Sequence, residues 1–147
     1  MKLISHRGNL NGPEVSSENL PASIEKVINL GFDCEIDFWC LGKKYFLGHD
    51  KPENEINLSF LNNYKDFLWV HCKNLEGLDE ILNLPFKIGA FWHQSDYFTL
   101  TTNGYIWTFP GQPTTRKSIL VNLDQDVIDL KQLDVYGICS DYIQRLI

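Results

Sequence analysis

An apolar run from Phe32 to Trp39 carries two acidic residues, and it constrains the fold more than any other stretch of the chain. The run predicts a β-strand that is buried on at least one side. Glu35 and Asp37 are two residues apart, so on a strand their side chains face the same way. Two carboxylates on one buried face are costly unless cations or hydrogen bonds compensate them. The alternative is an edge strand on which both acids are solvated.

The residues on either side of this strand favour a functional site. Two histidines and an arginine stand in short motifs before and after it. The chain carries, in this order, His6-Arg7-Gly8, Glu18-Asn19, Glu35-x-Asp37 and His49-Asp50. These four motifs resemble the glycerophosphodiester phosphodiesterase family, which is related to the spider-venom phospholipase D enzymes. The resemblance covers the first third of the chain closely and the remainder loosely, and Leu20 stands where the family usually has threonine.

Strand-like and helix-like segments alternate along the chain, which favours an α/β fold with a parallel sheet. The resemblance implies a TIM (β/α) barrel. Such barrels typically need roughly 200 to 250 residues, whereas this chain has 147 and shows no linker or repeat. We therefore expect one domain, residues 1–147. It should be a compact, trimmed TIM barrel with missing or shortened helices around its fourth to sixth strands.

The expected elements follow from periodicity and turn residues. Asn103-Gly104 between two β-prone runs predicts a hairpin, and residues 51–57 are expected to form a polar loop. Strands are expected at 2–5, 32–39, 45–47, 67–72, 86–92, 97–100, 105–109, 119–123 and 136–140, and helices at 20–31, 58–64, 75–82 and 125–133. In a barrel, residues that end successive strands meet at one face. His6, Glu35, Asp37, His71, Lys73, His93 and Asp141 all stand at or near such strand ends.

Phosphodiester cleavage needs a base and an acid, and two imidazoles can divide that work. By resemblance these are His6 and His49. Arg7 and Lys73 are the cations expected to bind the substrate phosphate.

The resemblance implies one divalent cation held by Glu35, Asp37 and a third acid. Here His71 occupies the place of that acid, two positions before Lys73. Mg²⁺ and Ca²⁺ prefer oxygen ligands, while imidazole suits Zn²⁺ or Mn²⁺ better. The metal is therefore expected to be Mg, Ca, Mn or Zn, held by Glu35, Asp37 and His71, unless the change to histidine has abolished binding. A zinc enzyme built on the histidines alone is less favoured, because no HxH or HxxxH spacing occurs.

Aromatic side chains crowd residues 92–109. They either fill the space of the missing helices or form a wall that stacks on a substrate, with Trp107 and His93 as the wall residues. If that flank lies bare, a symmetric homodimer is expected to cover it.

Composition excludes several classes of protein. The formal net charge of −6 argues against nucleic-acid binding. No apolar run is long enough for a membrane span. The first residues lack the features of a signal peptide. The four scattered cysteines indicate reduced core residues, so a cytoplasmic protein is expected.

Together these features predict a metal-dependent phosphodiesterase that hydrolyses a glycerophosphodiester-like small molecule by two-histidine acid–base catalysis. The alternative is a catalytically degenerate relative that binds a phosphorylated sugar or headgroup without cleaving it. A structural or partner-binding protein is a third interpretation, and only the aromatic cluster supports it.

Overall fold

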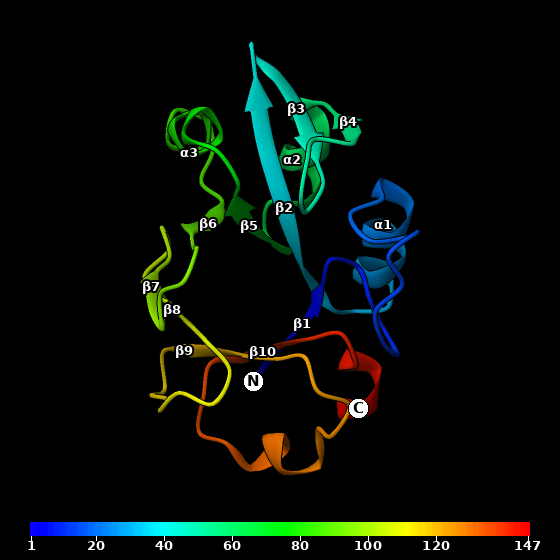
Figure 1. The fold of residues 1–147 in the computed structure, drawn as a ribbon, viewed down its shortest axis with the longest axis vertical. Helices are drawn as coiled ribbons and strands as arrows, with labels where there is room; N and C mark the ends of the chain where they lie inside the picture. The colour runs from blue at the N-terminus through cyan, green and yellow to red at the C-terminus, as the bar shows by residue number, and fades with distance from the viewer.

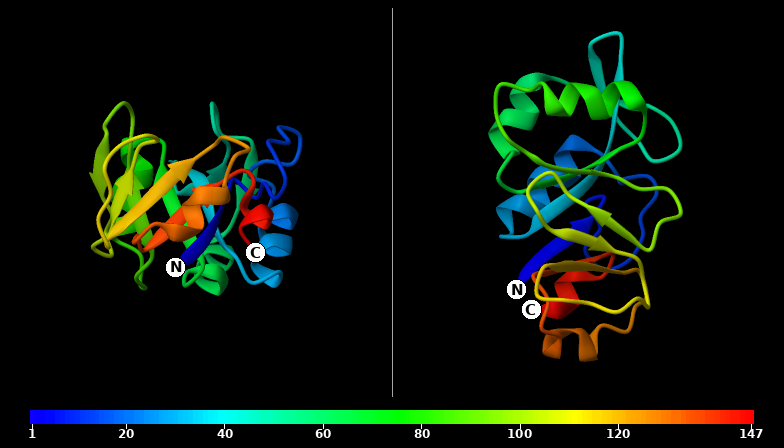
Figure 2. Two further views of the ribbon diagram at one scale, coloured as in Figure 1. Left: turned by 90° about the horizontal axis from the view of Figure 1, so that it is seen from below. Right: turned by 90° about the vertical axis from the view of Figure 1, so that its left-hand side faces the viewer.

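The structure, a computed structural model, describes residues 1–147 apart from the side chain of Ile128. Its ten strands form one mixed sheet that curls into a half-barrel (Figure 1 and Figure 2). The order along the sheet is β4-β3-β2-β1-β10-β9-β8-β7. β5 pairs along the other edge of β2, opposite β1 and β3, and β6 pairs with β5. All helices of the described residues fall short of the length and apolarity that crossing a bilayer requires.

The strands are β1 (Lys2–His6), β2 (Asp33–Leu41), β3 (Lys44–Leu47), β4 (Asn54–Ile56), β5 (Leu68–Cys72), β6 (Gly89–Trp92), β7 (Phe98–Leu100), β8 (Ile106–Thr108), β9 (Ser118–Asn122) and β10 (Gly137–Ser140). The α-helices are α1 (Pro21–Asn29), α2 (Leu58–Tyr64) and α3 (Leu75–Leu82), and two 3₁₀-helices are η1 (Ile128–Gln132) and η2 (Ile143–Leu146).

The prediction of a trimmed TIM barrel is wrong. Six strand pairings are parallel, which explains why the alternation in the sequence resembled a barrel. A TIM barrel also requires a helix after each strand, and the described residues contain three short α-helices, all before β6. Antiparallel pairs replace the missing units: β2-β3-β4 form a meander and β7-β8 a hairpin.

The antiparallel pairs have local causes. Asn103-Gly104 closes the β7-β8 hairpin, as the sequence predicts, with Gly104 at a φ of 85°. Residues 51–57 are not all loop, because β4 pairs with the edge of β3. The helix predicted at 125–133 is a 3₁₀-helix over a shorter range.

Helix α1 illustrates how the convex side of the sheet is covered. It begins with Pro21, whose missing N–H is tolerated in a first turn. It ends before Gly31, which has a φ of 93°. Its buried residues Ile24 and Val27 belong to the larger apolar core, together with Ile36 of β2.

Candidate active site

A second, smaller core lies on the opposite face of the same strands, and it supports the candidate site. Each strand residue of this core is followed two positions later by a residue that lines one cavity. The core residues are Ile4, Trp69, Phe91, Trp107, Ile119 and Cys139, and the residues that follow them are His6, His71, His93, Phe109, Val121 and Asp141. Because side chains alternate along a strand, the apolar layer and the cavity-lining layer share the concave face. The side chains at the carboxyl ends of these strands therefore line a single cavity of about 700 Å³.

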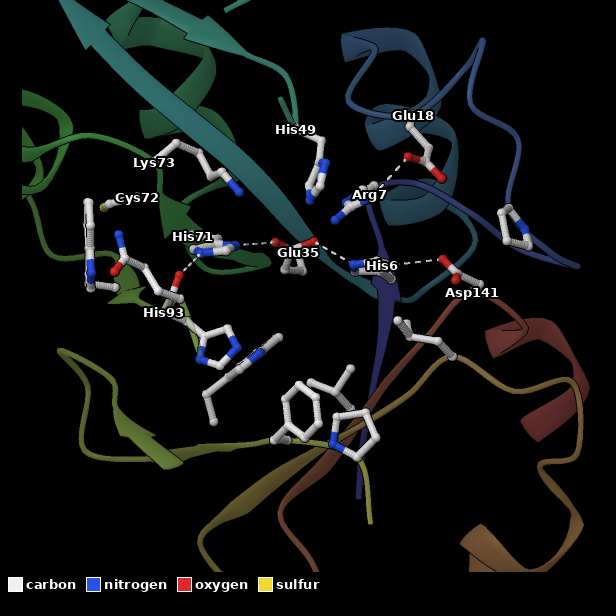
Figure 3. A pocket seen from close by; sticks show the side chains of 18 of the residues that line it. His6, Arg7, Glu18, Glu35, His49, His71, Cys72, Lys73, His93 and Asp141 are labelled. Carbon is white, nitrogen blue, oxygen red and sulfur yellow. Dashed lines mark hydrogen bonds and ion pairs between the residues drawn. The ribbon is translucent and has the colours of Figure 1, made fainter. Parts of the chain in front are cut away.

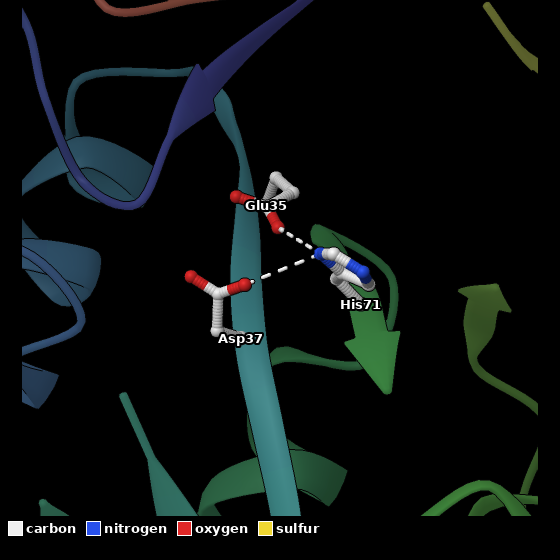
Figure 4. Close-up of side chains that lie close together, drawn as sticks. All are labelled: Glu35, Asp37 and His71. Atoms are coloured by element: carbon white, nitrogen blue, oxygen red, sulfur yellow. Dashed lines mark ion pairs between the residues drawn. The ribbon is translucent and has the colours of Figure 1, made fainter. Parts of the chain in front are cut away.

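Glu35 and His71 line this cavity, and Asp37 lies beside them, so that the three side chains form a cluster (Figure 4). One potential ligand atom from each lies within 4.8 Å of the others. Asp37 and His71 are directly paired in the β2-β5 register. Nδ1 of His71 lies 3.2 Å from Oδ1 of Asp37 and 3.8 Å from Oε1 of Glu35.

The backbone fixes the tautomer of His71. Its Nε2 is 2.9 Å from the carbonyl oxygen of His93. A carbonyl only accepts, so Nε2 carries the hydrogen and donates it. In a neutral ring, Nδ1 then presents a lone pair to two carboxylates, which is repulsive. A proton or a metal ion between these atoms removes the repulsion.

Asp37 is fully buried and surrounded by positive groups. Its Oδ2 lies 2.9 Å from Nε of Arg7, and its Oδ1 lies 3.4 Å from Nζ of Lys73. Burial would raise the pKa of this carboxyl, but the close contact with His71 and the charges of Arg7 and Lys73 lower it well below its usual range. Asn19 completes the shell: its Nδ2 donates to Oδ2 of Asp37, and its Oδ1 accepts from the Asp37 backbone N–H, both at 2.9 Å.

Glu35 is in the opposite electrostatic situation. Burial, and next the charge of Asp37, raise its pKa. Its Oε2 is buried without a hydrogen-bond partner, and 3.9 Å separates it from Nε2 of His6. Oδ1 of Asp37 likewise lacks a hydrogen bond, because its ion-pair contacts are poorly aligned for one. Two buried carboxylate oxygens without hydrogen bonds, beside an imidazole nitrogen, match the donor set of a divalent cation.

His6 forms a dyad with Asp141. Its Nδ1 donates to Oδ1 of Asp141 at 2.8 Å, so Nε2 faces Glu35 and the cavity (Figure 3). Burial would lower the pKa of His6, but the hydrogen bond to Asp141 and the charge of Glu35 raise it overall. Nδ2 of Asn9 donates to the same Asp141 oxygen at 2.7 Å and also to Glu18 at 2.9 Å. The imidazole is thus held in one orientation and one tautomer.

His49 reaches the same cavity from the loop after β3. The loop is held by the indole N–H of Trp39, which donates to the Gly48 carbonyl, and by the Gly48 N–H, which donates to the Asp37 carbonyl. A Cβ at Gly48 would clash with the carbonyl oxygen of Lys51. Burial, and next the charge of Arg7, lower the pKa of His49.

Arg7 and Lys73, the predicted phosphate-binding residues, both line the cavity. Arg7 has a φ of 55°, and its Nη1 lies 3.3 Å from Oε2 of Glu18 while Nε contacts Asp37. The labelled charged side chains extend across one side of the cavity from Lys73 to Asp141 (Figure 3).

The aromatic residues of 92–109 divide into two groups. Trp107 is buried and stacks on Phe91 with ring centroids 4.2 Å apart, and it lines the cavity together with His93. Tyr97 and Phe98 are exposed around β7. The segment therefore contributes both an inner wall and an outer apolar surface.

The structure brings all nine predicted site residues around one cavity, with Asp37 just beneath its surface. Sequence reasoning assigned no role to Asp141, although it stands at the end of the last strand. The amides of Asn9 and Asn19 were also missed. Asn19 belongs to a motif that was noted, whereas nothing in the sequence marked Asn9.

Comparisons with protein-family models, with curated proteins and with solved structures found no match to this chain. The resemblance to glycerophosphodiester phosphodiesterases therefore stays a prediction based on the short motifs.

Proposed function

We propose that this protein is a metal-dependent phosphodiesterase that hydrolyses a small glycerophosphodiester-like molecule. One observation carries the proposal. The oriented His6–Asp141 dyad directs its free nitrogen at Glu35, whose buried oxygen lacks a hydrogen bond in the cluster with Asp37 and His71. An acid–base group beside a set of cation ligands suits in-line displacement at phosphorus.

The opposite pKa shifts of the two histidines divide the acid and base roles. The raised pKa of His6 keeps its imidazolium available to protonate the leaving alkoxide. The lowered pKa of His49 keeps it neutral, so it accepts the proton of the attacking water. The bond from phosphorus to that water oxygen forms as the bond to the alkoxide breaks. Arg7 and Lys73 stabilise the negative charge of the phosphoryl oxygens.

The cation would be held by Glu35, Asp37 and Nδ1 of His71. When bound, it supplies Lewis-acid polarisation of a phosphoryl oxygen. Two carboxylates and one imidazole suit Mn²⁺ or Zn²⁺ and also accept Mg²⁺ or Ca²⁺.

The alternative function is binding of a phosphorylated ligand without cleavage, and one observation favours it. Arg7 and Lys73 both lie in ion-pair contact with Asp37. Two fixed positive charges partly replace the cation that this carboxylate would otherwise bind, and the third acid is absent. In this case Arg7 and Lys73 hold the phosphate and the histidines transfer no proton.

We also propose a homodimer as the partner that covers β7. This edge strand pairs with β8, and Tyr97, Phe98 and Leu100 expose 61%, 47% and 74% of their surfaces. Exposed apolar edges favour association. Sedimentation at micromolar concentration tests the dimer, and a monomer for both the wild type and Phe98→Asp would contradict it.

The test of the catalytic proposal is hydrolysis of bis-p-nitrophenyl phosphate with Mn²⁺, Mg²⁺ or Zn²⁺. We expect turnover by the wild type and a loss of roughly 10²-fold or more in His6→Ala and in His49→Ala. Lys117→Ala, at an exposed position away from the cavity, is the control and should keep full activity.

The two proposals predict different results. If the wild type binds inorganic phosphate but turns over no diester with any of the metals, the binding function holds. Turnover that survives in His6→Ala or His49→Ala at the wild-type rate would remove that histidine from the mechanism.

A further inference from the structure

The cavity is divided into a charged half and an apolar half. The ends of β1, β5 and β10 contribute histidines, a lysine and a carboxylate, and Glu35 within β2 contributes a second carboxylate. The ends of β8 and β9 contribute none. Along β8 and the residue after it, Trp107 is followed on the same face by Phe109, and along β9 Ile119 is followed by Val121 and then Leu123. Trp107 and Ile119 are paired in the parallel β8-β9 register, so the two rows run side by side.

These rows form an apolar track, defined here as Trp107, Phe109, Val121 and Leu123, that leads from the cavity floor to solvent. Exposure rises along it: Trp107 is 5% exposed, Val121 is half-buried, and Phe109 and Leu123 are 42% and 43% exposed. Val15 also lines the cavity and is 84% exposed. Single exposed apolar residues are ordinary, but a continuous track from a buried tryptophan to an exposed rim is not.

The chemistry of the track selects what can lie along it. Phe109, Val121 and Leu123 carry no hydrogen-bonding side-chain groups, so they offer nothing to the hydroxyls of glycerol or a sugar. Covering them with a polar group would leave its hydrogen bonds unmade. An alkyl chain has no hydrogen bonds to lose there, and burying its apolar surface against the track is favourable.

We infer that the ligand of this cavity is an amphiphilic phosphodiester, with its phosphate at Arg7 and Lys73 and an alkyl chain along the apolar track. This inference rests on the proposed function and narrows its substrate class. The charged half recognises the phosphate, and the apolar half recognises the esterified alcohol. The exposed end of the track lets a chain longer than the cavity continue outward, which a closed pocket would forbid.

Binding tests the inference without requiring turnover. Methyl methylphosphonate and octyl methylphosphonate are titrated by calorimetry below the micelle concentration, with and without Mn²⁺. Each buried methylene strengthens binding by about threefold to fourfold, so the octyl ester should bind at least about 100-fold tighter.

Two variants localise the effect. The double variant Phe109→Ser, Leu123→Ser should weaken octyl binding by about tenfold or more and leave methyl binding within about twofold. Leu75→Ser is the matched control, because Leu75 is an exposed apolar residue outside the cavity and away from β7. It should change neither affinity. Equal binding of the two esters, or an unchanged octyl affinity in the double variant, would overturn the inference.

Two further arms separate this inference from the proposed function. Phenyl methylphosphonate that binds more tightly than the octyl ester would assign the track to a flat aromatic group and overturn the alkyl assignment. p-Nitrophenyl methyl and p-nitrophenyl octyl phosphate are then compared as substrates. Hydrolysis of both substrates at the same kcat/KM would support the phosphodiesterase activity and refute the binding of an alkyl chain along the track. Tight octyl binding with hydrolysis of neither would support the track and refute catalysis.

Discussion

Replacing Asn19 with alanine is expected to destabilise the fold more than its small size suggests. Asn19 is 1% exposed, and its amide occupies the edge of β2 just beyond the last residue paired with β1. It accepts from the Asp37 backbone N–H and donates to the Asp37 carboxylate, both at 2.9 Å. Its φ of 57° is left-handed, a conformation that asparagine tolerates better than alanine.

The expected cost follows from these contacts. The lost hydrogen bond to a carboxylate is worth about 1.5–3 kcal/mol, and the backbone N–H left buried without a partner costs about 1–3 kcal/mol. The left-handed backbone adds about 1 kcal/mol for alanine. The total of about 3.5–7 kcal/mol is a large part of the 5–15 kcal/mol typical of a domain. It corresponds to a fall in Tm of about 10–20 °C.

Asn19→Gly supplies the matched control. Glycine removes the same two hydrogen bonds but adopts the left-handed conformation freely, so it should be about 1 kcal/mol more stable than Asn19→Ala. Urea unfolding and thermal melts measure both variants. A free energy of unfolding for Asn19→Ala within 1 kcal/mol of the wild type would refute the role given to this amide.

Three further predictions concern the site and the core. Calorimetry should detect Mn²⁺ or Zn²⁺ binding that strengthens as pH rises, because a histidine nitrogen such as Nδ1 of His71 ligates a metal only without its proton. This binding should disappear in the double variant Glu35→Ala, Asp37→Ala. The raised pKa of His6 stabilises the fold fully below pH 6.5, the ordinary pKa of histidine, and this stability is lost as pH rises through the pKa of His6 in the folded protein. The lowered pKa of Asp141 stabilises the fold fully above pH 3.8, the ordinary pKa of aspartate, and this stability is lost as pH falls through the pKa of Asp141 in the folded protein. Asp141→Asn should therefore cost most near pH 5 and least near pH 9, and an equal loss in urea melts at both pH values would contradict the dyad. The thiols of Cys34, Cys40, Cys72 and Cys139 are all buried, and burial raises the pKa of each. They should therefore react with a thiol reagent only after unfolding.

Local patterns in the sequence were enough to place most strands and α1, but not the closure of the sheet. The apolar stripe of α1 and its glycine stop are set by neighbouring residues, as is the Asn103-Gly104 turn. Strand β4 is only three residues long and owes its existence to pairing with β3. The barrel prediction was wrong because parallel order along a sheet and helical cover of each strand are separate properties. The alternation of segments indicates only the first.

The site was predictable where strand ends carry polar residues, and not where partners come from distant parts of the chain. His6 and Asp141 are 135 positions apart, and only the β1-β10 pairing brings them together. The sequence showed that each of these two residues lies at the end of a strand, but not that the two strands are neighbours in the sheet. Asn9 orients the dyad from a loop that carries no periodic signal.

The charge balance of the site links its protons, its cation and its substrate. The four carboxylates of Glu18, Glu35, Asp37 and Asp141 face the two fixed cations of Arg7 and Lys73, which leaves a net charge of −2 when all four carboxylates are ionised and the histidines are neutral. In a buried cavity such an excess is costly. Under the proposed function, protons on imidazoles supply the missing positive charge at low pH and a divalent cation would supply it at higher pH, so protons and cation would compete. With a cation bound the balance would be neutral, and an imidazolium would then give the positive charge that a phosphodiester anion requires. The proposed function therefore implies that cation and anion bind better together than either one alone.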